Sequence, residues 1–374
     1  MRGHLTERRP GVWRLVVSDG FDPDGGRRQI TRTVRGSKRD AERALTQMLR
    51  DRDQGMLADG RQTLEHYLTG EWLPAVSAVS KRGRALAPTT RQRYADSVRH
   101  VTESIGRVRL SDLRPSHVER VRDRLLADWL GPQTVSDVLR VLSQALSRAE
   151  ARGLVGRNPA DPKLVHRPAG MPTTVAVIDP ALAGAILNAA TGQDPWDGAV
   201  HLALGLGLRR EEVLALRWQD VDDAVHVRQA LTAADGELHF GPPKSMAGRR
   251  DLPMPSFVAA ALQRHRLAQA ERLLPLGLPR PELVVCNATG QPFQPASFSG
   301  LWRDFATANG FEGITFHGLR HGAATLLLAA GVPDAVAAAI IGHADTKILR
   351  RYQDVVADLK RDAATGMDRL LGEA

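Results

Sequence analysis

Six side chains in the C-terminal half of the chain are of types that together can act on a phosphodiester. They are two arginines, one lysine, two histidines and one tyrosine: Arg209, Lys244, His317, Arg320, His343 and Tyr352. An arginine guanidinium binds two non-bridging phosphate oxygens at once and stays charged near neutral pH. A tyrosine hydroxyl can attack phosphorus, but with an ordinary pKa of about 10 it needs help to lose its proton. Histidine can give that help, and lysine can return a proton to a departing 5′ oxygen, so the set suits phosphoryl transfer driven by electrostatics.

The sequence places these side chains at the starts of helices and at turns. Arg209 opens the apolar helix predicted in GLGLRREEVLALRW, and Lys244 lies at a turn marked by glycine and proline in GPPKSMAGRRDLPM. His317 and Arg320 are three residues apart in HGLRHGAAT, so they share one face of a helix. The last histidine lies in IGHADTKILRRYQDV, nine residues before the tyrosine.

This ordered set of segments resembles the conserved boxes of the tyrosine recombinase family, the lambda-type phage integrases. GLRREEVLALRW is similar to the first-arginine box of the family, HGLRH to its His-x-x-Arg box, and IGH followed by a tyrosine to its last box. The resemblance implies that Tyr352 is the nucleophile and that five residues activate the phosphate or move protons: Arg209, Lys244, His317, Arg320 and His343. It also implies a supporting carboxylate at Glu212. Glu211 stands where glycine is common in the family.

The lysine is placed by a turn rather than by a sharp motif. Arg249 and Arg250 are the other basic side chains near Lys244 in the same segment. A lysine ammonium can donate a proton, whereas a guanidinium holds its proton near neutral pH. We therefore predict that Lys244 is the general acid, with the two arginines as neighbouring basic candidates.

The full chain has a net charge of +9, and its excess of basic residues is concentrated in the N-terminal half. Residues 61–168 hold 19 Lys and Arg against 11 Asp and Glu, and residues 1–60 hold 13 against 9, whereas residues 169–374 hold 19 against 22. A positive region of this kind can bind the phosphates of DNA.

Other classes of protein are disfavoured by the composition. Cys286 is the only cysteine, so neither a disulfide framework nor a Cys-based zinc site is available. The histidines show no metal-like grouping, and we expect no cofactor. The chain has no apolar run of about 18 residues and no signal peptide, which predicts a soluble, cytoplasmic protein that associates with the nucleoid when it binds DNA.

Periodicity and turn residues divide the chain into three domains and predict a mainly α protein with small β-sheets. Residues 1–60 combine a small sheet over 11–36 with a helix from Ser37 to Gly55. Residues 61–168 are nearly all helical and are best described as a four-helix bundle. Residues 169–374 form a mixed α+β domain, with helices expected over 179–190, 195–206, 209–217, 255–273, 295–309, 317–330, 333–341 and 346–357.

The resemblance extends to the two N-terminal domains. It implies that residues 61–168 are a core-binding domain and that residues 1–60 are a module that binds accessory arm sites on DNA. Candidate DNA contacts in the core-binding domain are Arg91, Arg93, Tyr94 and Arg140.

The implied function is that of an integrase of a phage or mobile element. Such an enzyme cuts and rejoins double-stranded DNA through a 3′-phosphotyrosyl link, as a homotetramer on two duplexes, with an excisionase and a host DNA-bending protein as possible partners. Three alternatives remain open: a chromosome-dimer resolvase, a type IB topoisomerase and a non-catalytic DNA-binding regulator. The N-terminal module argues against the first, relaxation of supercoils without a specific site would favour the second, and loss of Tyr352 or an arginine would favour the third.

Overall fold

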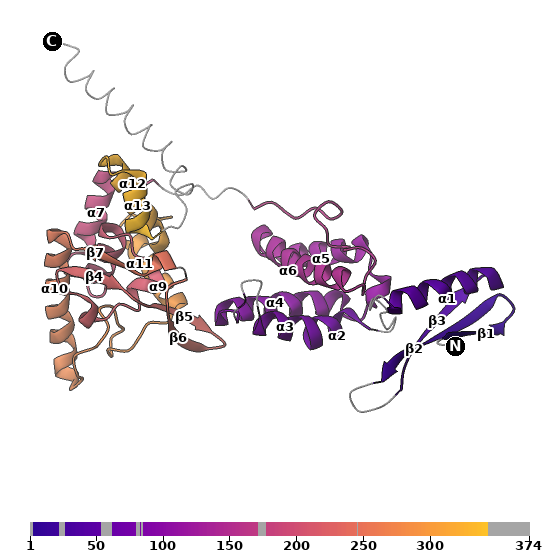
Figure 1. The fold of residues 1–374 in the computed structure, drawn as a ribbon. Helices are drawn as coiled ribbons and strands as arrows, with labels where there is room; N and C mark the ends of the chain where they lie inside the picture. The colour runs from indigo at the N-terminus through magenta and orange to yellow at the C-terminus, as the bar shows by residue number, and fades with distance from the viewer. Residues whose placement is uncertain are drawn as a thin grey trace, which may run out of the picture. The chain divides into compact units, whose positions relative to one another are not determined.

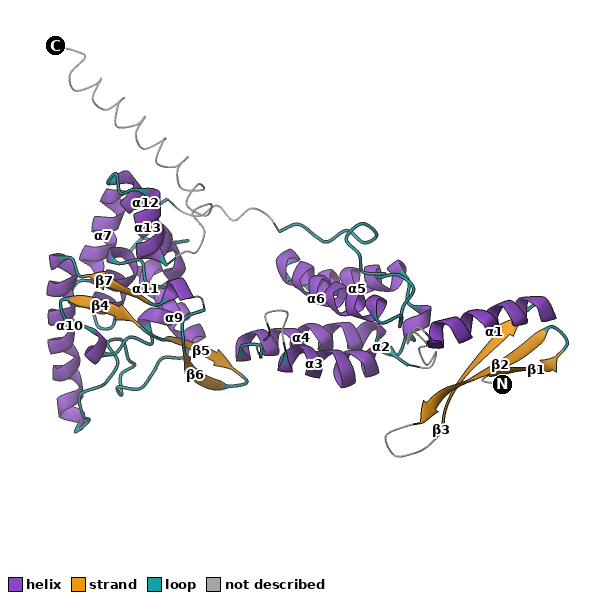
Figure 2. Cartoon of the chain, viewed as in Figure 1, coloured by secondary structure: helices purple, strands orange, loops and turns teal. Residues whose placement is uncertain are grey.

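The computed structural model describes residues 3–21, 27–53, 62–79, 83, 85–170, 177–244 and 246–342. The chain divides into two compact units, Met1–Pro172 and Thr173–Ala374. Helices dominate both units, and the strands form small separate sheets (Figures 1 and 2). This architecture confirms the predicted fold class.

The first unit begins with an antiparallel three-stranded sheet in the order β1-β2-β3. Its strands are β1 (Gly3–Arg9), β2 (Val12–Phe21) and β3 (Arg27–Arg35), and the helix α1 (Lys38–Asp53) follows. Alternation along the strands sends Leu15, Val17 and Ile30 into one small core with residues of α1. The prediction placed the sheet at 11–36 and missed β1, because GHLTERR has too few apolar residues to show alternation.

The rest of the first unit is helical, as predicted, and has its own apolar core. Its helices are α2 (Leu64–His66), a π-helical segment (Tyr67–Trp72), α3 (Leu73–Ala78), α4 (Pro88–Ile105), a short 3-10 helix (Leu110–Asp112), α5 (Pro115–Ala127) and α6 (Pro132–Ala151). Prolines open α4, α5 and α6, where their missing N–H costs nothing. Gly153 adopts a positive φ of 70° just beyond α6, which is the usual role of glycine after a helix.

The second unit packs helices around two short two-stranded sheets, β4 with β7 and β5 with β6. Its first elements are α7 (Pro180–Ala190), α8 (Trp196–Val200), a π-helical segment (His201–Gly205), α9 (Arg210–Val213) and a 3-10 helix (Trp218–Asp220). The strands are β4 (Ala224–Val227), β5 (Ala230–Ala234), β6 (Glu237–Gly241) and β7 (Arg250–Pro253), with a 3-10 turn (Met246–Gly248) before β7. The remaining elements are α10 (Ser256–Leu273), a 3-10 helix (Leu274–Leu276), α11 (Pro295–Ala308), α12 (Phe316–Ala329) and α13 (Asp334–Ile341).

Most predicted helices of this unit form where they were expected. The helix predicted over 209–217 is much shorter, because α9 ends at Val213 and the chain then pairs with a distant segment: Trp218 N–H donates to Glu282 O, and Val284 N–H to Leu216 O. The helix predicted over 346–357 lies outside the described residues. Within the described part of the chain, no helix is both long and apolar enough to span a membrane.

Candidate active site

Arg209 stands at the start of α9 and is held there by Glu212. Its backbone N–H donates to Glu212 Oε2 at 3.0 Å, and its Nη1 donates to Glu212 Oε1 at 2.6 Å. One carboxylate therefore caps the helix and orients the guanidinium at the same time. The Glu212 side chain is only 1% exposed, whereas that of Arg209 is 24% exposed. The arginine thus keeps a face that a ligand could reach.

Glu212 serves a second arginine from β7. Arg250 Nη2 donates to Glu212 Oε2 at 3.0 Å, and its Nε donates to Ile340 O at 2.7 Å. Burial alone would raise the pKa of Glu212, but the charge and hydrogen bond of Arg250, together with Arg209, outweigh burial and lower that pKa. Because Arg250 is buried and occupied by these acceptors, the structure argues against its candidacy as a general acid.

Arg320 projects from α12 into the protein and is 2% exposed. Its Nη1 donates to the carbonyl oxygen of Gly207 at 2.5 Å. Gly207 has a φ of +65°, a left-handed conformation that favours glycine, and a Cβ there would meet the side chain of Ile341 between α12, α13 and the segment that leads to Arg209. Two arginines that are far apart in the sequence are thereby brought to one site.

His317 lies at the start of the same helix, where Thr315 accepts a hydrogen bond from Gly318 N–H at 3.0 Å. The pKa of His317 lies below its ordinary value, first because the surrounding protein desolvates the imidazole and then because the charge of Arg320 disfavours protonation. Arg209, Arg210 and Glu211 also affect this pKa. The histidine therefore shares the electrostatic environment of both candidate arginines.

His321 packs edge-on against His317, with ring centroids 4.7 Å apart. Desolvation, followed by the charges of His317 and Arg320, lowers the pKa of His321 to about 4. A neutral ring beside His317 adds no further positive charge to a site that already holds several arginines. His321 therefore packs locally, against His317 on the same helix.

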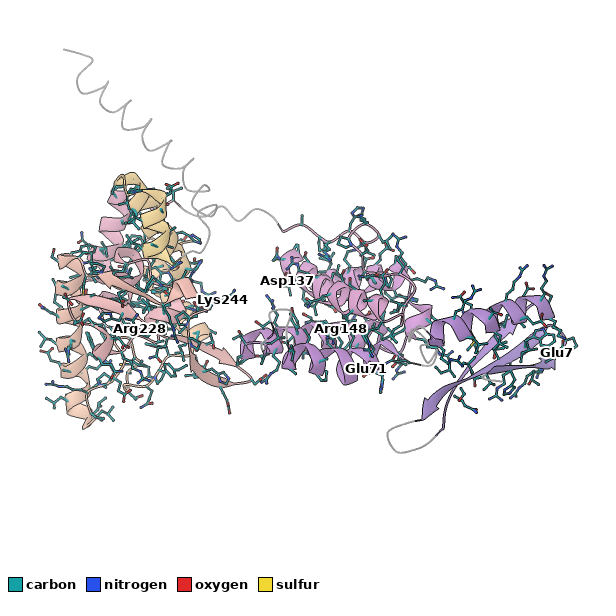
Figure 3. All side chains as sticks on the ribbon, in the orientation of Figure 1. Glu7, Glu71, Asp137, Arg148, Arg228 and Lys244 are labelled. Atoms are coloured by element: carbon teal, nitrogen blue, oxygen red, sulfur yellow. The ribbon has the colours of Figure 1, made fainter. Side chains whose placement is uncertain are left out.

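The remaining predicted residues are not joined to this cluster by any described contact. Lys244 is exposed in the bend that follows β6, where Figure 3 labels it. His343 and Tyr352 lie outside the described residues. Among the described residues, no group of three or more His, Cys, Asp or Glu side chains could hold a metal ion.

The candidate DNA contacts of the first unit differ in their surroundings. Arg91 and Arg93 are exposed in the first turns of α4, and Arg140 is exposed on α6, where it pairs with Asp137. Tyr94 is half-buried: its ring stacks on Trp72 at 5.5 Å, and its hydroxyl donates to Gln144 Oε1 at 3.1 Å. Tyr94 therefore helps to pack the helical core, whereas the sequence analysis predicted only a DNA contact for it.

The prediction from the sequence did not include the structural role of Arg250, which binds Glu212 and the end of α13. A signal was present, because alternation in RDLP places Arg250 and Leu252 on the same inward face of β7. A buried arginine needs hydrogen-bond acceptors or a charged partner, and Glu212, a candidate partner, was already named for another reason.

Comparison with known proteins agrees with the family resemblance seen in the sequence motifs. The model of the Phage integrase family matches residues 181–358, which include the cluster described above. Over these residues the chain is similar to the phage integrase family. The chain is 28% identical over 382 residues to an integrase of Streptomyces ambofaciens, covering 98% of this chain and 95% of that one. It is 22% identical over 376 residues to the ICEBs1 integrase of Bacillus subtilis, covering 96% and 98%.

Solved structures support the fold of the chain. The Tn1549 transposon integrase in complex with a circular intermediate DNA aligns with a TM-score of 0.65 and 19% identity over 80% of this chain and 99% of that one. A lambda integrase tetramer bound to a Holliday junction aligns with a TM-score of 0.58 and 18% identity over 93% and 94%. At these identities the likeness concerns the fold alone.

Proposed function

We propose that this chain is a site-specific DNA recombinase, an integrase that inserts or excises a phage or mobile element. The main observation behind the proposal is that Arg209, Arg320 and His317 lie close to one another near Gly207. Two preorganised guanidiniums suit the charge that gathers on a five-coordinate phosphorus. The names of the relatives, which include phage and element integrases, support the same function.

The proposed reaction is a pair of transesterifications. The Tyr352 hydroxyl attacks the scissile phosphorus, the P–O5′ bond breaks, and a 3′-phosphotyrosyl link remains. His317 or His343 assists the loss of the tyrosine proton, and Lys244 gives a proton to the departing 5′ oxygen. A 5′ hydroxyl from the partner strand then attacks the link and releases the tyrosine. One phosphodiester replaces another, so the reaction needs no ATP.

Three domains would divide the work, with the first unit containing two of them. The separate cores of residues 1–60 and 61–168 support that division. We assign core-site binding to residues 61–168, where Arg91, Arg93 and Arg140 offer exposed positive charge to phosphates. Tyr94 is left out of this assignment because its side chain packs inward.

The N-terminal module offers one face of its sheet to a second DNA site. Along each strand, the residues that alternate with the core residues point to the face opposite α1. They include Thr6, Arg14, Thr31, Thr33 and Arg35. Hydroxyls and guanidiniums at alternate positions suit the base edges and phosphates of a major groove, which admits a narrow β-ribbon. Residues 1–60 are therefore proposed as the arm-site module.

A homotetramer on two duplexes is the proposed assembly, because strand exchange between duplexes needs one nucleophile for each of four strands. The lambda integrase relative is a tetramer on a Holliday junction. An excisionase and a host DNA-bending protein are proposed as further partners, and the chromosomal DNA of the cytoplasm as the place of action.

The decisive experiment compares the parent with Tyr352→Phe. The ring is kept, so the variant should shift its DNA site in a gel as the parent does, yet give no covalent protein–DNA adduct after denaturation. The parent should give the adduct in buffer with EDTA, because the arginines supply the charge stabilisation. An adduct formed by the phenylalanine variant, or one mapped by peptide sequencing to Tyr67 or Tyr94, would overturn the proposal.

A further inference from the structure

Two arginines form hydrogen bonds with the C-terminal end of α13. The residues at this end are the last described residues before the segment that contains His343 and Tyr352. Arg250 Nε donates to Ile340 O at 2.7 Å, and Arg209 Nη2 donates to Gly342 O at 2.9 Å. The last carbonyls of a helix have no partner inside the helix and form the negative end of its dipole. The two guanidiniums therefore satisfy both the hydrogen bonds and the charge of this helix end.

The contact at the helix end leaves no spare room. Gly342 has a φ of +71°, and a Cβ there would lie 2.9 Å from Ala247 O and 3.0 Å from Arg250 Nη1. The turn before β7 is tied to the same arginine, since Arg250 Nη1 donates to Gly248 O at 3.1 Å. Arg250 thus joins the turn after Lys244, the carboxylate of Glu212 and the end of α13.

The two arginines share one carboxylate but differ in exposure. The Arg250 side chain is 7% exposed and that of Arg209 is 24% exposed, while both bond to Glu212. Arg250 is enclosed by protein acceptors, so it neutralises Glu212 and leaves part of Arg209 accessible. Without Arg250, the buried carboxylate would lose the hydrogen bond that ties it to β7 and would have only Arg209 as a charged partner.

We propose that Arg250 is a positioning residue for DNA cleavage. It fixes the guanidinium of Arg209 through Glu212, and it fixes the point where the chain leaves α13 toward His343 and Tyr352. It touches neither the phosphate nor the reacting atoms. This inference rests on the proposed recombinase function, which it deepens by adding a residue that acts through Arg209 and through the end of α13.

Arg272 offers a matched control within the same unit. It also binds a carboxylate, Asp194, and two carbonyl oxygens, Asn287 O at 2.9 Å and Ala288 O at 2.6 Å. Removal of either arginine leaves a carboxylate and two carbonyls without their guanidinium. A general loss of stability should therefore affect Arg250→Met and Arg272→Met alike, whereas a positioning role belongs to Arg250 alone.

The test uses the full-length protein and three measurements: gel shift on the crossover site, single-turnover cleavage of a nicked suicide substrate, and hydrogen exchange without DNA. Arg250→Met should bind DNA within about twofold of the parent, cleave at least about tenfold more slowly, and exchange faster at the amides of residues 337–342. Arg272→Met should leave both cleavage and α13 exchange near parental values. Equal cleavage losses in the two variants, or parental cleavage by Arg250→Met, would overturn the proposal.

A second variant and a second substrate sharpen the test. Arg250→Lys keeps a positive charge beside Glu212 but offers no fork for Ile340, so it should fold and still cleave several-fold more slowly. A substrate with sulfur at the bridging 5′ position releases a thiolate that needs no proton donor. It should rescue Lys244→Ala but not Arg250→Lys, and rescue of the latter would assign Arg250 to proton transfer instead.

The result separates this inference from the proposed function. A parent protein that forms no covalent adduct would refute the recombinase proposal. The hydrogen-exchange measurement needs no DNA. If the amides of residues 337–342 exchanged as slowly in Arg250→Lys as in the parent, that result alone would refute the proposal that Arg250 fixes the end of α13.

Discussion

The candidate DNA-contact arginines of the first unit differ in exposure from Arg250 and Arg320 of the second unit. In the first unit, Arg91, Arg93 and Arg140 are exposed on helices, in a region where basic residues outnumber acidic ones. In the second unit, where acidic residues are in slight excess, Arg320 and Arg250 are buried and bound to carbonyls or to a carboxylate. Exposed charge attracts DNA of any sequence and is weakened by salt. Buried charge in a fixed position can act on one phosphate.

This difference teaches that attraction and chemistry should be separable in this protein. A change in the first unit should weaken DNA binding while the cleavage rate of bound DNA is kept. A change at the buried arginines should do the reverse. The cost of burying an arginine is offset in each case by a specific acceptor, such as Gly207 O for Arg320 and Glu212 for Arg250.

Among changes that test this comparison, the largest effect is expected for Arg320→Lys. Lysine keeps the charge but cannot hold both Gly207 O and a phosphate oxygen with a rigid fork, so cleavage of a nicked substrate should fall by about 100-fold or more. DNA affinity should stay within about twofold, because this buried side chain contributes little to long-range attraction. Arg303→Lys, an exposed position on α11, is the control and should cleave normally. A normal rate for Arg320→Lys would remove Arg320 from the site.

Truncation of the N-terminal module should come next in size. A protein beginning near Arg61 should cleave an isolated crossover site as the full chain does, because its buried arginines are untouched. On intact attachment sites it should integrate about 100-fold less, since a second tethered module raises the effective concentration at the crossover site. Integration assays on both kinds of DNA check this, and equal integration by the two proteins would contradict the arm-site proposal.

A smaller effect is expected for Arg93→Ala on α4. Loss of one phosphate contact should weaken binding several-fold at low salt, for all DNA sequences alike, and should reduce the slope of log affinity against log salt by about 1. The cleavage rate at saturating protein should not change. Arg99→Ala is a control on the same helix, because Arg99 already pairs with Asp96 at 3.2 Å. An unchanged salt slope for Arg93→Ala would place that residue outside the DNA contact.

The smallest effect concerns the pH dependence that His317 imposes. Its pKa lies below the ordinary value, so it is neutral at pH 7, and cleavage at limiting protein should fall only as acid protonates it. Glu211 raises this pKa, so Glu211→Gln should move the acid limb of the rate profile to lower pH. A shift toward higher pH, or none, would exclude His317 as the group that controls the limb.

Much of the fold could be predicted because its signals are local. Prolines at the first positions of α4, α5 and α6 and the apolar stripe of α6 identified the helices of the first unit. The spacing of His317 and Arg320 placed both on α12. By contrast, the polar strand β1 is stabilised mainly by pairing with β2, and the short α9 ends where the chain turns to pair with Val284. Pairing between distant segments leaves no mark in local periodicity.

The sequence by itself determined the order of the candidate residues, the family resemblance, the helical bundle and the uneven charge, because each depends on residue type and spacing along the chain. Only the tertiary structure decided which partners the arginines have. It bound Arg320 to the carbonyl of Gly207, turned Tyr94 onto Trp72, and enclosed Arg250 between Glu212 and Ile340. The physical reason is that a guanidinium can bond to any nearby acceptor, and the folding of segments 38 to 113 residues apart determines which acceptors are near.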